Sequence, residues 1–330
     1  MRRGLLVLLV VVVAAVPLAA IVIARAAVDL LPDQPAARSG YSWSSVKQRP
    51  PLRRTEVAGA VAGGDVYVIG GFVRSQSTTA VVERFRAGKW SRVRSLPVPL
   101  NHAAAVGYHG HAYVVGGYAS RNGLTDPVKT LYRYDPKKNR WRRLPDMPTP
   151  RAALAVGVVR GRLYAVGGAA GGKQIATLEV YDITKRRWSR GASLSVAREH
   201  LGGAVHGGRF YAVAGRNNDS GNLAIVESYD PRSRRWTRLP DMPKARGGNG
   251  AASLGDGIVA VGGEEAGGTI AEVDRFDFGT RRWQRLEPMP TPRHGLAVVT
   301  AGDGSVWAVS GGPQPGFAFS SAVEVLRPTR

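Results

Sequence analysis

Short apolar runs that end in paired small residues recur along the chain. Residues 163–168 read LYAVGG, and related runs read VYVIGG, AYVVGG, FYAVAG, GIVAVGG and VWAVSGG. The first small residue of each pair falls at 70, 116, 167, 214, 262 and 311, so the period is 46 to 51 residues. A period in this range indicates a repeat architecture, in which each unit buries its apolar face against its neighbours.

Each repeat predicts four strands, which we label a to d in chain order. A proline-rich turn precedes a small-residue strand such as AALAVGVV from Ala152; a polar turn, the LYAVGG strand, a variable loop, a strand such as LEVYD, a basic turn and a tryptophan follow. Strand a is rich in Ala, Gly and Val, whereas c and d carry the large aromatics. Such wedges arranged about an axis close into a ring with protected edges. The paired glycines let the chain turn out of strand b and let the next blade approach closely.

These residues resemble the Kelch-repeat family. The resemblance covers residues 43–330 and rests on the glycine pairs, the proline-arginine step before strand a, and the spacing from a strand-c aromatic to a strand-d tryptophan: Phe85 to Trp90, Tyr134 to Trp141, Tyr181 to Trp188, Tyr229 to Trp236 and Phe276 to Trp283. Ala214 and Leu100 depart from the pattern, and the sixth repeat lacks its tryptophan strand. The resemblance implies an all-β, six-bladed propeller.

The missing strand has a candidate at the other end of the chain. YSWSSVKQRPPLRR, with Trp43 lying 47 residues before Trp90, is a d strand with no a, b or c before it. We therefore predict that this N-terminal strand completes the last blade. The chain would then enter and leave the ring on the face that carries the turns between strands c and d.

The N-terminus differs from the rest of the chain. An uninterrupted apolar stretch runs from Leu5 to Ala24, long enough to span a hydrocarbon core as one hydrophobic helix, and Arg2 and Arg3 would stay in the cytoplasm. Pro17 and the A-x-A pattern at Ala24 also fit a cleaved signal peptide. We assign residues 1–26 to a signal anchor or signal peptide, 27–42 to a linker and 43–330 to the propeller. The propeller is then extracytoplasmic, either held in the cell membrane by a single span or secreted, and N-terminal sequencing distinguishes the two.

Composition and charge limit the possible partners. The 330 residues contain no cysteine and carry a formal net charge of +22, with basic c–d turns such as DPKKNRWRR. These turns are either solvated hairpin tips or a basic rim that contacts anionic headgroups. Nucleic acid is not an expected partner, because no recognition helix or regular aromatic-basic path is present. We expect a monomer.

Five arginines recur just before strand a: Arg54, Arg151, Arg198, Arg246 and Arg293. One hypothesis is that they form a partial ring around the channel mouth and bind a carboxylate or phosphate, whose paired oxygens match the guanidinium fork. The alternative is that they hydrogen-bond loop carbonyls and have a structural role. The sequence leaves both open.

Histidines and a glutamate follow these positions. His102, Glu199, His200 and His294 lie one or two residues further on and are weak catalytic candidates. A metal site would require histidines of alternate blades to converge, and His294 is one step out of register with the other two. We therefore predict no metal and no cofactor.

The function favoured by these patterns is a binding scaffold whose d–a and b–c loops, on the face opposite the c–d turns, bind a protein, a glycan or an anionic small molecule. Copper chemistry of the galactose-oxidase type needs a cysteine, and the S-x-D-x-G-x-x-W boxes of sialidases are absent. The alternative is a carbohydrate-active enzyme similar to a six-bladed sugar-acid mutarotase or epimerase. Glu199 or a histidine would then act as the acid-base group.

Overall fold

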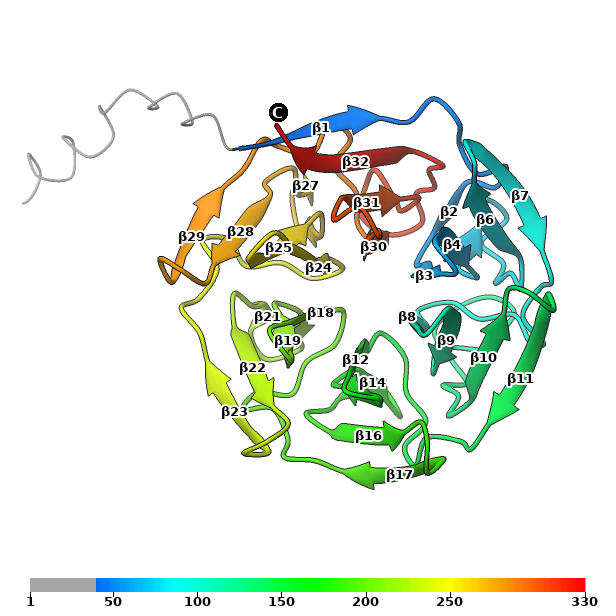
Figure 1. Cartoon of the computed structure of the whole chain (residues 1–330), viewed down its shortest axis with the longest axis horizontal. Coiled ribbons are helices and arrows are strands. Elements are labelled where there is room, and N and C mark those ends of the chain that lie inside the picture. Colours follow the sequence, from blue (N-terminus) through cyan, green and yellow to red (C-terminus); the bar gives the residue numbers. More distant parts are fainter. Residues whose placement is uncertain (1–39, 330) are drawn as a thin grey trace, which may run out of the picture. The chain divides into compact units, whose positions relative to one another are not determined.

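The computed structural model describes residues 40–329 and has six four-stranded antiparallel sheets arranged around one axis (Figure 1). No α-helix occurs in this part of the chain. The sheets are the blades of a propeller, so the predicted all-β, six-bladed fold is confirmed. The expected N-terminal hydrophobic helix, and with it the anchor or signal peptide, lies outside the described residues.

Within each blade the strands are ordered a, b, c, d from the axis outward, which is chain order in all blades except the sixth. The innermost strands are β3 (Ala58–Ala62), β8 (Ala104–Tyr108), β12 (Ala155–Val159), β18 (Gly202–His206), β24 (Gly250–Leu254) and β30 (Ala297–Thr300). The b strands are β4 (Asp65–Ile69), β9 (His111–Val115), β13 (Arg162–Val166), β19 (Arg209–Val213), β25 (Gly257–Val261) and β31 (Val306–Val309). The c strands are β6 (Val82–Arg86), β10 (Leu131–Asp135), β16 (Leu178–Asp182), β22 (Val226–Asp230), β28 (Asp274–Asp277) and β32 (Val323–Pro328). The outer strands are β7 (Lys89–Val93), β11 (Arg140–Leu144), β17 (Arg187–Arg190), β23 (Arg235–Arg238), β29 (Arg282–Arg285) and β1 (Tyr41–Ser45).

Short two-stranded ribbons stand on one face of the ring. Three of them are formed within the loops between strands b and c, and the fourth joins the d–a loop of blade one to its b–c loop. The ribbons are β14 (Ala169–Ala170) with β15 (Lys173–Gln174), β20 (Arg216–Asn217) with β21 (Gly221–Asn222), β26 (Glu264–Glu265) with β27 (Gly268–Thr269), and β2 (Arg54–Thr55) with β5 (Phe72–Val73). We call this face the ribbon face; the c–d turns lie at the other end of the c strands.

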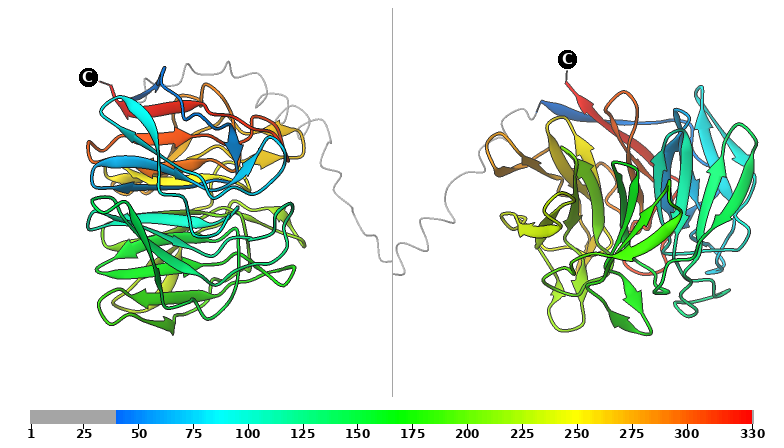
Figure 2. Two further views of the ribbon diagram at one scale, coloured as in Figure 1. Left: turned by 90° about the vertical axis from the view of Figure 1, so that its right-hand side faces the viewer. Right: turned by 60° about the horizontal axis from the view of Figure 1, so that its bottom comes forward.

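The sixth blade is closed by the N-terminal strand. β1 pairs antiparallel with β32, with Tyr41 opposite Pro328 and Trp43 opposite Leu326, and the two strands run side by side in Figures 1 and 2. Ring closure by this strand is confirmed. Pairing begins at Tyr41, so the propeller starts two residues before the predicted boundary. The chain enters and leaves where the other blades have their c–d turns, as expected.

In blades one to five, the strand-c aromatic residue and the strand-d tryptophan lie opposite each other as a cross-strand pair. Tyr181 lies directly opposite Trp188, for example, and the two rings are 5.2 Å apart. Each strand-d indole also donates its N–H to a carbonyl in the segment that follows strand d of the preceding blade, as Trp188 does to Pro145 at 2.8 Å. The tryptophans therefore stabilise the contact between successive blades as well as the pairing of strands c and d within their own blade.

Small residues let the blades approach one another. A Cβ at Gly107 would overlap the Val61 carbonyl of the preceding blade, and Gly117 turns out of strand b with a φ of +102°. In the sixth blade the two residues that turn out of strand b with positive φ are Ser310 and Gly311 (φ +58° and +97°). The sequence pattern indicates the pair one position later, at Gly311 and Gly312. The apolar cores lie between successive blades, as in the cluster that joins Tyr67 of blade one to Val114 of blade two.

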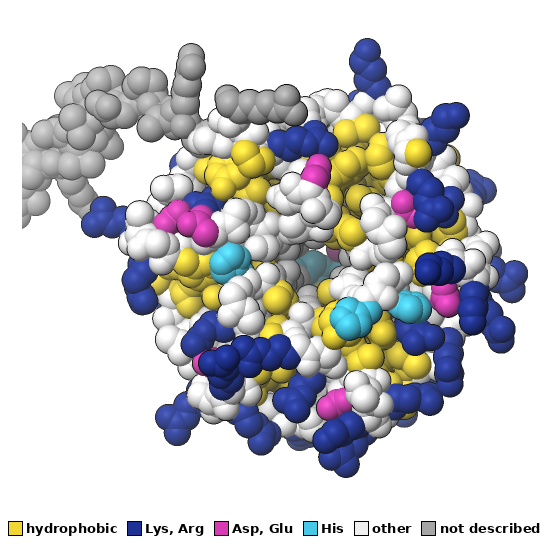
Figure 3. Space-filling model, in the orientation of Figure 1, with side chains coloured by type: hydrophobic (Ala, Val, Ile, Leu, Met, Phe, Trp, Pro, Cys, Tyr) yellow, Lys and Arg dark blue, Asp and Glu magenta, His cyan; other side chains and the backbone are white. Residues whose placement is uncertain are grey.

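The basic turns form an exposed rim. Arg186, Arg187, Arg234 and Arg235 are exposed, and Lys and Arg side chains surround the periphery of the propeller (Figure 3). Membrane contact by this rim stays a prediction. Within residues 40–329 no helix is long and apolar enough to cross a membrane.

Candidate functional site at the channel mouth

The five repeated arginines are fully buried inside their blades. Each guanidinium pairs with a carboxylate at the start of strand c of its own blade, at 2.6 to 3.1 Å: Arg54 with Glu83, Arg151 with Glu179, Arg198 with Glu227, Arg246 with Asp274 and Arg293 with Glu324. Backbone carbonyls accept further hydrogen bonds, as Gly70 and Val81 do from Arg54. Burial lowers the pKa of Arg54 to about 10 against the opposing attraction of Glu83.

Blade two shows what happens when the arginine is absent. Leu100 stands in the arginine position, and Tyr132 stands where the other blades have the carboxylate. Both side chains are buried. The two partners are replaced together, as expected if one buried charge without the other is strongly unfavourable.

The prediction that the five arginines form a partial ring around the channel mouth is therefore wrong. All five side chains have an exposed fraction of 0% and turn into the blades rather than toward the axis. Their guanidinium groups already have carboxylate and carbonyl partners, and the structural alternative, hydrogen bonding to loop carbonyls, is what the structure shows.

A closed ring of backbone hydrogen bonds lies at the channel mouth, two residues after the arginine position of each blade. We call its members the axial ring: Glu56, His102, Ala153, His200, Gly248 and Gly295. From His102 to Gly295, the amide of each member donates to the carbonyl of the preceding member at 2.9 to 3.1 Å, and Val57 N, rather than Glu56 N, closes the circle by donating to Gly295 O. All six have left-handed φ values of +51° to +69°.

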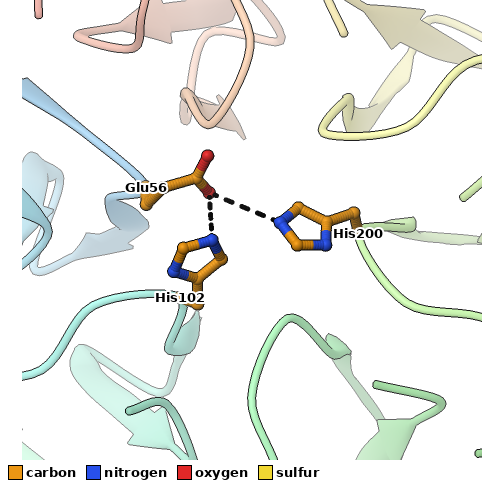
Figure 4. Close-up of side chains that lie close together, drawn as sticks. All are labelled: Glu56, His102 and His200. Carbon is orange, nitrogen blue, oxygen red and sulfur yellow. Dashed lines mark ion pairs between the residues drawn. The ribbon is translucent and has the colours of Figure 1, made fainter. Parts of the chain in front are cut away.

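Polar side chains of the axial ring converge over this mouth. Glu56 and His102, from blades one and two, and His200 from blade four point toward one another (Figure 4), with His102 Nε2 3.1 Å and His200 Nε2 4.0 Å from Glu56 Oε2. His294 joins them, because its Nε2 lies 3.5 Å from Glu56 Oε1. They line or border a cavity of about 120 Å³ at the axis. We call these four residues the histidine cluster.

Three charged residues surround the histidine cluster. Glu199 Oε1 lies 3.2 Å from His200 Nδ1. Arg216, on the b–c ribbon of blade four, donates to Glu264 Oε1 at 2.6 Å and reaches His200 Nε2 at 3.3 Å. Histidines from alternate blades, His102, His200 and His294, thus lie close together, as a metal site formed by them would require.

The charge states of the site follow from burial and from these neighbours. Burial alone would raise the pKa of Glu56, but the three histidines and Arg216 together lower it to about 2. Burial lowers the pKa of His102 to about 4, despite the opposing charge of Glu56. At neutral pH His102 is therefore uncharged and Glu56 is ionised.

Sequence reasoning found His102, Glu199, His200 and His294 but missed Glu56, Arg216 and Glu264. Glu56 has a usable signal, because it occupies the same register as His102 and His200 relative to strand a. Arg216 and Glu264 lie on b–c ribbons, where loop lengths vary and no register can be read. The carboxylate partners of the arginines were also predictable, since an acidic residue lies at the start of strand c in the same five repeats that carry the arginine.

Comparison with known families covers most of the propeller. Residues 39–195 match the family described as the KLHDC2/KLHL20/DRC7 Kelch-repeats domain. Residues 197–243 and 245–290 each match the Kelch motif.

Individual relatives match over shorter stretches. The chain is 36% identical to Kelch-like ECH-associated protein 1B of Danio rerio over 108 residues, which are 32% of this chain and 18% of that protein. It is 28% identical to Kelch repeat and BTB domain-containing protein 1 of cowpox virus (strain Brighton Red) over 128 residues, 39% of this chain and 22% of that one. The match thus spans about a fifth of each relative. Among solved structures, YjhT superposes with a TM-score of 0.72 at 17% identity, covering 85% of this chain and 97% of YjhT, which shows a shared fold.

Proposed function

Because this chain belongs to the Kelch-repeat family of β-propellers, we propose that it is a scaffold that binds a protein partner on its ribbon face. The observation that carries the proposal is the position of exposed apolar side chains. Among residues 40–329 the strongly exposed large hydrophobic side chains are Leu124, 52% exposed, and Phe317, 47% exposed. Both lie in b–c loops, of blades two and six. Exposed aromatic and aliphatic side chains on a polar surface are typical anchors of a protein interface.

Contacts between the loops support a preformed binding surface. Blade one lies between the two loops and is tied to both: Thr78 N donates to Arg121 O at 2.8 Å, and Arg54 N donates to Ser320 O at 2.9 Å. The Phe317 ring packs edge-on against Phe72 at 5.1 Å. Loops already held together lose little conformational freedom on binding, which favours affinity.

The test is a double substitution on this face, Leu124→Ser with Phe317→Ser. Proteins retained by the immobilised chain are identified, the tightest one is purified, and its Kd is measured by calorimetry. If the two side chains are interface anchors, we expect a loss of about 2 kcal/mol or more, which is roughly 30-fold in Kd.

The matched control substitutes Arg186 and Arg187 with alanine at a c–d turn, at the opposite end of strand c. This variant should keep the affinity of the unmodified protein. Loss of binding in the control and full binding in the loop variant would place the partner on the basic rim and refute the proposal.

A glycan or anionic small molecule stays an alternative partner of the same face. With the five repeated arginines buried, Arg216 is the guanidinium at the channel mouth for such a ligand, and its side chain is 33% exposed. Two existing carboxylate partners, Glu199 and Glu264, compete for it. This competition is why we favour a protein partner.

A second candidate function is sugar-acid isomerisation, such as mutarotation. It is favoured by His102 and His200 lining one cavity, with Glu199 beside His200, because carboxylate and imidazole groups can transfer protons. If the protein is such an enzyme, it should accelerate anomeric exchange of a sugar acid followed by NMR, and His200→Ala should slow that exchange about 100-fold or more. No acceleration by the unmodified protein would remove this candidate.

A further inference from the structure

Each imidazole of the histidine cluster has an oxygen atom near its Nδ1, and for His102 and His294 that contact is a hydrogen bond. His102 Nδ1 lies 2.7 Å from Asn101 Oδ1. His200 Nδ1 lies 3.2 Å from Glu199 Oε1, and His294 Nδ1 lies 3.1 Å from Gly312 O. A carbonyl oxygen only accepts, so the Nδ1 atom of His294 carries the proton in its contact with Gly312. The guanidinium of Arg216 only donates, so the Nε2 atom of His200, 3.3 Å away, is the acceptor in that contact.

The orientation of the Asn101 amide shows that Nδ1 of His102 also carries a proton. Thr78 donates its hydroxyl to Ser120 O at 2.6 Å, so its oxygen accepts from Asn101 Nδ2 at 2.8 Å. The other end of the amide, Oδ1, then faces His102 and accepts from Nδ1. In an uncharged imidazole whose Nδ1 is protonated, the lone pair is on Nε2.

When these imidazoles are uncharged, their Nε2 lone pairs therefore face the carboxylate of Glu56. The Nε2 atoms lie 3.1, 4.0 and 3.5 Å from oxygens of Glu56, for His102, His200 and His294 respectively. Acceptors that face one another at these distances in a largely buried site repel unless a positive species lies between them. Arg216 reaches the Nε2 of His200 only.

We propose that Glu56, His102 and His200 form a binding site for a divalent transition-metal cation at the channel mouth. One ligand atom from each lies within 4.8 Å of the other two. Tetrahedral bonds of 2.0–2.1 Å would place ligand atoms about 3.3 Å apart, so small side-chain movements are enough to close the site. Two imidazoles and one carboxylate are ligands that zinc and similar metals accept, and an open position remains for water or a partner's side chain.

The surroundings of the three ligands suit a metal centre. The hydrogen bond from His102 Nδ1 to Asn101 Oδ1 orients that ring, as the outer partners of metal-binding histidines do, and the carboxylate of Glu199 lies 3.2 Å from His200 Nδ1. The cluster and its surroundings contain three carboxylates, those of Glu56, Glu199 and Glu264, but one guanidinium, that of Arg216. The resulting excess of negative charge favours a cation.

The backbone also favours a dedicated site. Glu56, His102 and His200 have φ values of +53°, +51° and +52°, a conformation that costs a side-chain-bearing residue energy, and the equivalent positions in blades five and six are Gly248 and Gly295. Gly295 also leaves room for Glu56, since a Cβ there would lie 2.5 Å from Glu56 Oε1. Side chains at strained positions that point into one cavity indicate a role beyond folding.

The experiment is Zn²⁺ titration of the untagged, chelator-treated protein by calorimetry, with Co²⁺ absorption as a second readout of ligand geometry. We expect one equivalent to bind, and Zn²⁺ to raise the melting temperature. His102→Ala and Glu56→Gln should each abolish the high-affinity phase, and Glu199→Gln should weaken it about 10- to 100-fold. Arg216→Met should tighten binding, because it removes a competitor for the His200 lone pair.

The control is His109→Ala with His111→Ala, which removes two histidines on the a–b turn of blade two. This variant should keep the single high-affinity equivalent. Three results would overturn the proposal. The first is loss of Zn²⁺ binding in this variant alone, and the second is full Zn²⁺ binding by Glu56→Gln and His102→Ala variants that are folded by circular dichroism. The third is that the unmodified protein binds no Zn²⁺. In the last case an imidazolium paired with Glu56 is the positive species. The inference does not depend on the scaffold proposal.

Discussion

A chain that begins at Leu52 is expected to aggregate or to melt far below the intact protein. It lacks β1, so β32 becomes an open edge with unpaired backbone groups. It also loses Tyr41 and Trp43 from the core between blades five and six, and the hydrogen bond from the Trp43 indole to Glu287 O at 3.0 Å. Removing even one large packed aromatic costs about 3–5 kcal/mol, a large share of the usual 5–15 kcal/mol of stability. Thermal denaturation followed by circular dichroism measures the loss.

The control for this truncation is a chain that begins at Arg38, which keeps β1 whole. It should fold as the intact propeller does. Equal melting temperatures for the chains beginning at Arg38 and Leu52 would mean that the N-terminal strand does not hold the ring closed.

Breaking one buried ion pair should have the largest effect of any single substitution discussed. Arg198→Met leaves Glu227 as a buried carboxylate without its guanidinium partner, which lay at 2.6 Å. Loss of one member of a buried pair typically costs about 3–5 kcal/mol. Urea denaturation, read by tryptophan fluorescence, gives the change in the free energy of unfolding.

Blade two supplies the matched rescue. Arg198→Leu combined with Glu227→Tyr reproduces the Leu100 and Tyr132 pair of that blade, and should recover most of the stability because no buried charge remains. An exposed comparison is Arg238→Ala, whose pair with Asp241 has side chains 54% and 47% exposed and should contribute within about 1 kcal/mol. A double variant no more stable than Arg198→Met would contradict this account of the arginines.

Several features were predictable because they are local or periodic. The glycine pairs, the small-residue strand a and the spacing from Tyr181 to Trp188 each depend on residues close in sequence, and six copies make the pattern unambiguous. Closure by the strand at Trp43 could also be predicted, because the sixth repeat lacks one strand and an isolated strand of the right kind precedes the first. The one-residue error at Ser310 arose because three small residues in a row offer two registers for one turn.

The site depended on the tertiary structure. Whether Arg54 faces the axis or the blade interior is decided by Glu83, which lies 29 residues away and comes beside it only when strand c folds back onto strand b. Glu56, His102, His200 and His294 come from four different blades, and only the closed ring, with the left-handed backbone at its axis, brings the three Nε2 atoms to 3.1–4.0 Å from the Glu56 carboxylate. The sequence determined the repeat, the blade and the closure, since these follow from short-range periodicity. The tertiary structure decided which charged groups are buried in pairs and which meet at the axis, since those contacts join residues tens to hundreds of positions apart.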